Sequence, residues 1–165
     1  MPINPKWTRW AWASVLEHFI VALANNPNPD TDPLPVFAEG QKRDTNDLKT
    51  FCEIRMDGPW FTEVSKDCWR IYGEVNALVS AHMDEKDMHI LHRSVGEVTA
   101  AFTDISVYRF GDEATDDDSF VWCWKLIQDM RARERVQVAN FGVIEPNTKL
   151  SQAIVEGHYD VLYNP

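Results

Sequence analysis

The side chains best suited to hold a metal ion gather in a short stretch near the middle of the chain. They are His82, Asp84, Asp87, His89 and His92. On a helix, His89 and His92 would share one face, which is the arrangement that two zinc ligands need. No HExxH motif surrounds them and no third ligand is specified, so surface histidines are the better interpretation. We therefore expect neither a metal site nor a cofactor.

The usual signatures of nucleophilic or nucleotide chemistry do not occur in this sequence. It has no GxSxG, GxGxxG or GxxxxGK[ST] motif. The odd number and wide spacing of Cys52, Cys68 and Cys123 favour reduced thiols over disulfides or a zinc ribbon. The acidic run DEATDDD at 112–118 lacks the spacing and the glycine of a calcium loop, so a solvated loop is favoured. These patterns predict a protein that is not an enzyme.

Length and charge limit the classes of function that are left. A chain of 165 residues with 44% hydrophobic and 25% charged residues is typical of one globular domain, here 1–165. Its net charge of -10 argues against a protein that grips nucleic acid, because clustered Lys and Arg supply most of that affinity. Glu17 and His18 interrupt the apolar run 10–24, so we expect neither a signal peptide nor a membrane span.

The sequence pattern predicts two helices that could position functional side chains. Apolar residues at three- and four-residue spacing predict a helix from just after Pro5 to about Ala24. A proline-rich, polar loop region follows at 25–47, because its prolines cannot continue a helix. The second helix is expected at 84–104, where acidic residues in the first turn suit the helix dipole.

Alternating patterns predict about six strands. Their ranges are 48–58, 68–81, 105–111, 119–129, 134–144 and 149–163. An Asp57-Gly58-Pro59 turn is expected to close the first of them, with a long connection after it. Strands in this order with helices set on one face predict an α+β fold, a mostly antiparallel sheet of about five to six strands with two helices packed on it.

The strands at 68–81 and 149–163 have the strongest alternation. In the first, an apolar face lies opposite a mixed face that includes Arg70, Tyr72 and Glu74 and suits solvent or a neighbouring copy. Gly73 and Gly157 lie in the middle of the two apolar faces. Glycine at such a place indicates a bulge or the close approach of another backbone element.

Tryptophan is unusually frequent, with seven in the chain. Three lie in predicted strands, where burial is the favoured interpretation: Trp69, Trp122 and Trp124. Four others crowd the start of the first helix or lie in an exposed connection: Trp7, Trp10, Trp12 and Trp60. Because large aromatic side chains are favoured at protein interfaces, contact with a partner and simple burial are equally favoured interpretations for these four.

Four segments follow one another in a distinctive order: EIRMDGPWF, WRIYGEVNALV leading into a helix, VYRFGDEATDDDSF and the closing VEGHYDVLY. With the helix and long loop before them, they resemble the tail terminator or tail-completion proteins of tailed bacteriophages. Those are small α+β proteins that form rings at the head-tail junction. The resemblance covers most of the chain from Cys52 onward and consists of strand and turn patterns.

The resemblance implies a structural virion protein that is assembled in the host cytoplasm. It would form a homo-oligomeric ring, commonly a hexamer, between the tail tube and the head-side connector, with no membrane contact. DNA would pass through the bore without specific binding. The candidate contacts with other copies or partners are Trp7, Trp10, Trp12, Trp60, Arg70, Tyr72 and Glu74.

Two other classes of function stay open at this point. A capsid-decorating or adaptor protein of the virion would use the same fold and would differ only in its partner. A small metal-dependent hydrolase would need His89 and His92 to hold an ion.

The acidic run also yields a prediction about DNA passage. We expect Asp112, Glu113, Asp116, Asp117 and Asp118 to face the bore and repel phosphates, so that DNA slides past. Changing all five to Asn or Gln should slow or trap DNA passage while ring assembly stays intact. Plaque counts and electron microscopy of the particles measure both effects, and unchanged infectivity would contradict the placement.

Overall fold

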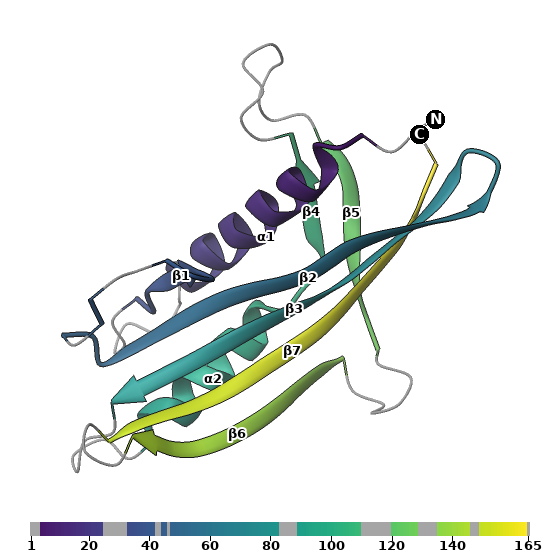
Figure 1. The fold of residues 1–165 in the computed structure, drawn as a ribbon. Coiled ribbons are helices and arrows are strands. Elements are labelled where there is room, and N and C mark those ends of the chain that lie inside the picture. The colour runs from purple at the N-terminus through teal and green to yellow at the C-terminus, as the bar shows by residue number, and fades with distance from the viewer. Residues whose placement is uncertain are drawn as a thin grey trace.

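A computed structural model describes residues 4–24, 33–41, 44–45, 47–82, 89–109, 120–128, 135–145 and 149–164. Two helices and seven strands follow one another along these residues (Figure 1). They are α1 Trp7–Ala24, β1 Val36–Ala38, β2 Thr50–Ser65, β3 Cys68–His82, α2 Ile90–Ala101, β4 Ile105–Tyr108, β5 Phe120–Ile127, β6 Val136–Glu145 and β7 Leu150–Tyr163.

The strands form one curled sheet, and both helices lie on the same side of its long strands (Figure 1). The strand order is β1-β2-β3-β7-β5-β4, and β6 pairs with β7 beside β5. The α+β prediction with two helices is confirmed. The sheet is mixed, however, since β1 runs parallel to β2, and it has seven strands where five to six were expected. The added strand, β1, lies inside the predicted loop region 25–47, where three residues are too few to give an alternation signal.

Helix α1 confirms its predicted bounds. Asn4 accepts a hydrogen bond from the backbone N–H of Lys6 at 2.9 Å, and Pro5 follows it just before the helix, which suits the start of a helix. Helix α2 is shorter than expected among the described residues, since it begins at Ile90 rather than 84. The acidic residues expected in its first turn lie outside the described residues.

Strand β2 corrects one predicted boundary. Asp57-Gly58-Pro59 does not form a turn, and the strand continues through it to Ser65. The register between β2 and β3 shifts between Asp57 and Trp60, so Gly58 and Pro59 form an irregularity within the ladder. A bulge accommodates proline, which cannot donate a ladder hydrogen bond. The chain reverses after Ser65 instead, where Asp67 adopts a left-handed φ of 61°.

The core lies between the helices and the inner face of the sheet. Alternate residues of β3 are fully buried, namely Ile71, Val75, Ala77 and Val79. Trp7 and Trp10 of α1 are also buried, at 7% and 3% exposure, so they are core residues rather than the partner contacts considered above. The long strands extend past the start of α1, so the Trp7 ring packs 5.3 Å from Trp122 and 5.1 Å from Tyr163 between ring centroids.

The glycines in the two long strands make room for aromatic rings. A Cβ atom at Gly73 would lie 2.7 Å from the Trp124 ring and 3.0 Å from the Asp57 carbonyl oxygen. At Gly157 it would lie 2.5 Å from the Phe102 ring. The predicted close approach therefore exists, although side-chain rings make most of it. Trp124 is held in place because its indole N–H donates to the Ile71 carbonyl at 2.9 Å.

This packing predicts opposite effects for two glycine substitutions. Gly73→Ala should lower the free energy of unfolding by about 1–3 kcal/mol, because the buried Trp124 ring and the β2 backbone must move. Gly96→Ala, on α2, should leave stability unchanged or raise it by about 0.5–1 kcal/mol, because the new Cβ would meet no atom within 4 Å apart from its own helix backbone and chain neighbours. Urea unfolding measures both. Equal unfolding midpoints for Gly73→Ala and the wild type would contradict this account of the core.

Candidate functional site

A row of polar side chains crosses the outer face of the sheet, opposite the core. Because side chains alternate along a strand, Arg70, Tyr72, Glu74 and Asn76 of β3 share this face. The antiparallel register places Asp160 opposite Tyr72, His158 opposite Glu74 and Glu156 opposite Asn76. Pairing between β3 and β7 therefore brings together charged residues that lie more than eighty positions apart in the chain.

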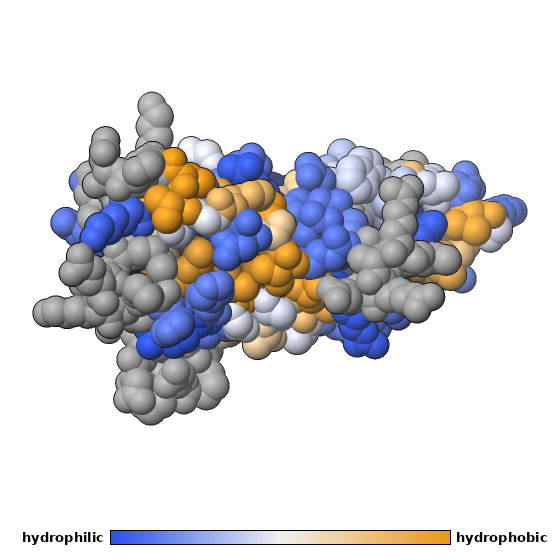
Figure 2. Space-filling model, turned by 90° about the horizontal axis from the view of Figure 1, so that it is seen from below, coloured by the Kyte–Doolittle hydropathy of each residue, from blue (hydrophilic) through white to orange (hydrophobic). Residues whose placement is uncertain are grey.

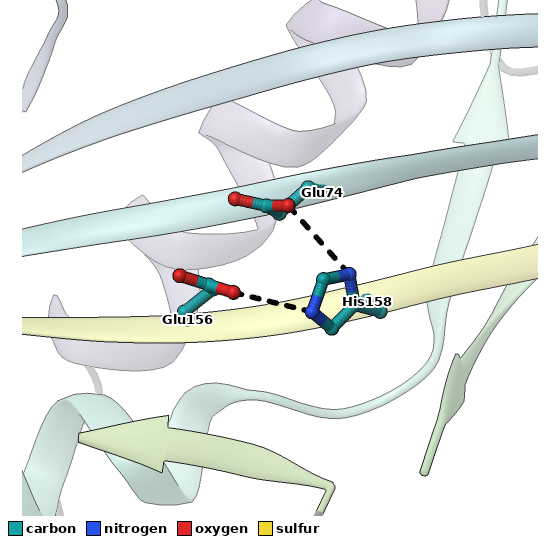
Figure 3. A group of neighbouring side chains, drawn as sticks. All are labelled: Glu74, Glu156 and His158. Atoms are coloured by element: carbon teal, nitrogen blue, oxygen red, sulfur yellow. Dashed lines mark ion pairs between the residues drawn. The ribbon is translucent and has the colours of Figure 1, made fainter. Parts of the chain in front are cut away.

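The centre of this row is His158 between two carboxylates (Figure 3). His158 Nδ1 lies 3.7 Å from Glu74 Oε2, and His158 Nε2 lies 3.2 Å from Glu156 Oε1. The three side chains are half-buried, with 27 to 31% exposure. These three residues, Glu74, Glu156 and His158, form the group among the described residues that has the spacing to share one metal ion.

Asn76 supports this group from beside it. Its side-chain amide donates to Glu74 Oε1 at 2.8 Å, which leaves Oε2 to face His158. Asn76 is only 8% exposed, and its Oδ1 atom is buried with no hydrogen-bond partner among the described residues. A buried acceptor without a partner is costly, so this position is set up for a donor.

The end of the row holds three of the candidate contact residues. Arg70 donates to Asp160 at 2.8 Å, and its guanidinium lies 5.4 Å from the centre of the Tyr72 ring. The Trp60 ring of β2 lies 5.4 Å from the same ring and is 45% exposed. Trp12 is apart from them, since it is half-buried and packs against the core.

A second surface feature is the edge of the sheet at β6. Among the described residues, β6 pairs with β7 alone, so its other edge has no strand beside it. Four large apolar residues of β6 are 43 to 56% exposed: Val138, Phe141, Val143 and Ile144. Seen from the β6 side, apolar side chains gather in the middle of the surface between hydrophilic ones (Figure 2). The sequence predicted this strand, but its exposure depends on which strand occupies the edge.

Among the described residues, none of the histidines singled out from the sequence belongs to a group of three possible metal ligands. His89 and His92 are both exposed, His82 ends β3, and Asp84 and Asp87 lie outside the described residues. The five acidic residues of 112–118 also lie outside them. Sequence reasoning missed His158 as a possible ligand, because its neighbours come from strand register and no local motif marks it.

A shallow groove of about 370 Å³ is lined by residues of α1 and β4 and by Asp104. His18 Nε2 lies 2.9 Å from the Ala101 carbonyl, and Asp104 accepts hydrogen bonds from Lys125 at 2.8 Å and from the Leu126 N–H at 2.9 Å. The hydrogen bonds from Lys125 and from the Leu126 N–H hold the pKa of Asp104 below its ordinary value. Away from the groove, burial strongly raises the pKa of the Cys52 thiol, which keeps it protonated and unreactive.

Comparison with known proteins adds information about the fold. No family model matches the chain, and no curated protein matches it. Five chains of solved structures do match. One of them is 12% identical in sequence and aligns over 95% of this chain and 96% of its own, with a TM-score of 0.54. At that identity the likeness shows a shared fold alone. Neither helix described here has the length and apolarity needed to cross a membrane.

The groove yields a prediction about pH. A carboxylate with a lowered pKa stabilises the folded chain above its unfolded pKa, about 3.9 for Asp, and the contribution is lost as pH falls through the folded value. Asp104→Asn should therefore lower the urea midpoint near neutral pH, with a gap to the wild type that closes in acid. Lys125→Met should reduce the same gap, since it removes the largest cause of the shift. A gap that does not change with pH would contradict this role.

Proposed function

We propose that this protein is a structural component of a tailed-phage virion. In this proposal it forms a homo-oligomeric ring, expected to be a hexamer, at the head-tail junction, where it contacts the tail tube and the head-side connector. The observation that carries the proposal is the apolar edge of β6, beside which no further strand lies among the described residues.

A free edge of this kind favours association. Unpaired backbone groups along an edge strand can pair with another chain, and soluble proteins usually protect such edges with charged residues or proline. The described part of β6 exposes four large apolar side chains, and its sequence VQVANFGVIE has no Lys, Arg or Pro. The register shift between Asn140 and Gly142 alters only part of the edge. Coverage by a neighbouring copy explains why this edge is apolar.

Ring closure requires a contact between two different surfaces of the same chain. Such a heterologous contact repeats around an axis until the last copy meets the first. In this proposal the β6 edge supplies one of the two surfaces. The exposed cluster of Trp60, Tyr72 and Arg70 lies on the outer face of the sheet and is available to a second partner.

The chemistry of the described residues also favours a structural role. Cys52 is buried and protonated, and the groove beside α1 holds an Asp104 that is engaged by Lys125 and the backbone. The net charge of -10 suits a ring through which DNA passes without being bound. A capsid-decorating or adaptor role would use the same association surface and would differ in its location on the particle.

Substitution at the β6 edge tests the proposal. Val143→Lys should prevent ring formation, because a charge replaces a valine that is 56% exposed on the free edge. The free energy of unfolding should change by less than about 0.5 kcal/mol, since the site is on the surface of the monomer. Native mass spectrometry and sedimentation velocity measure assembly, and urea unfolding measures stability.

The matched control is Val21→Lys on α1, where the valine is 47% exposed. That variant should assemble as the wild type does. Normal rings in Val143→Lys would exclude the β6 edge as the contact. A wild-type chain that stays monomeric at high concentration, alone and with the tail tube protein, would count against the ring itself. Labelling of intact particles separates a neck position from a capsid position.

A further inference from the structure

We propose that Glu74, Glu156 and His158 form a binding site for a divalent transition-metal ion, with Zn²⁺ as the best-matched ion. The site would join β3 to β7 on the outer face of the sheet (Figure 3). This inference rests on the geometry of the three residues and does not depend on the proposed role in the virion.

The three residues lie close enough together to share one ion. Zinc lies about 2.0–2.2 Å from nitrogen and carboxylate ligands, so two ligand atoms at a tetrahedral angle are about 3.3 Å apart. Each residue offers one ligand atom, and these three atoms lie within 4.8 Å of one another. The two carboxylates contact different ring nitrogens of His158, at 3.2 Å from Nε2 and 3.7 Å from Nδ1, and only one nitrogen can bind a given ion. Rotation of the side chains must therefore bring the second carboxylate toward the nitrogen that binds the ion.

Two negatively charged side chains meet in this part of the sheet. Glu74 and Glu156 are half-buried carboxylates on either side of His158. The nearby Arg70 is engaged by Asp160. A divalent cation would balance the two negative charges that the sheet holds together.

Asn76 provides an observation that is independent of the three ligands. It lies opposite Glu156 in the register, and its amide orients Glu74 by a 2.8 Å hydrogen bond, as outer residues do around metal ligands. Its Oδ1 atom is a buried acceptor with no partner among the described residues. A water molecule bound to the ion would supply the missing donor. Three protein ligands and one water complete a four-coordinate zinc site.

The donor set selects the class of ion. Ca²⁺ and Mg²⁺ prefer oxygen ligands and higher coordination numbers, whereas one imidazole and two carboxylates suit Zn²⁺ and related transition metals. All three ligands stand on paired strands, which hold side chains more firmly than loops do. The bound ion would therefore act as a link across the central pair of strands and stabilise the sheet.

Titration of the metal-free full-length chain with ZnCl2 tests the site. Isothermal calorimetry above the ordinary pKa of histidine, about 6.5, should show saturation at one ion per chain. His158→Ala and Glu156→Gln should each weaken the affinity by about tenfold or more. Zn²⁺ should also raise the unfolding temperature of the wild type, because it binds only the folded chain.

His92→Ala is the matched control, since it removes an exposed histidine of α2 outside the site. It should bind Zn²⁺ and be stabilised as the wild type is. Glu156→Gln keeps the size of the side chain, so its Zn²⁺ affinity tests the site even if circular dichroism shows that His158→Ala folds poorly. Failure of the wild type to bind, or equal binding by Glu156→Gln, would overturn the proposal. Native mass spectrometry in the presence of a chelator keeps this test separate from ring assembly.

Discussion

The pairing of β3 with β7 is the interaction on which the rest of this structure depends. The two strands stay in register from Trp69 opposite Tyr163 to His82 opposite Leu150, without a register shift in the antiparallel ladder. One face of this pair builds the core under the helices, and the other carries the polar row. Because the side-chain period is two, a slip of one residue would exchange the faces and expose the core.

The same pair also sets the shape of the interior. Gly73 and Gly157 lie on the inner face of the two strands, and each removes a Cβ atom where an aromatic ring packs against the sheet. Trp124 arrives from β5 and Phe102 from the end of α2, so the two glycines connect the central strands to both sides of the fold. Four of the seven tryptophans, including Trp7 and Trp10, are buried in this interior.

The two surfaces with a possible role differ in their chemistry. The β6 edge is apolar and lacks a neighbouring strand in the part of the chain described, which suits contact with another protein chain. The polar row is built from charges that the strand pair holds at ligand spacing, which suits a small cation. Both surfaces belong to β7 and its immediate neighbours, so a change in the register of β7 would affect the fold, the edge and the candidate metal site together.

The sequence by itself determined the local elements of this protein. Alternation predicted β3 and β7, helical spacing predicted α1, and the mid-strand glycines indicated a close approach, because each of these signals arises within a few neighbouring residues. Tertiary structure alone decided what depends on distant partners. It carried β2 through Gly58 and Pro59, buried Trp7 and Trp10, left β6 at an edge, and placed Glu74 of one strand opposite His158 of another. Strand pairing joins residues far apart in the chain, and no local pattern specifies which strand becomes the neighbour.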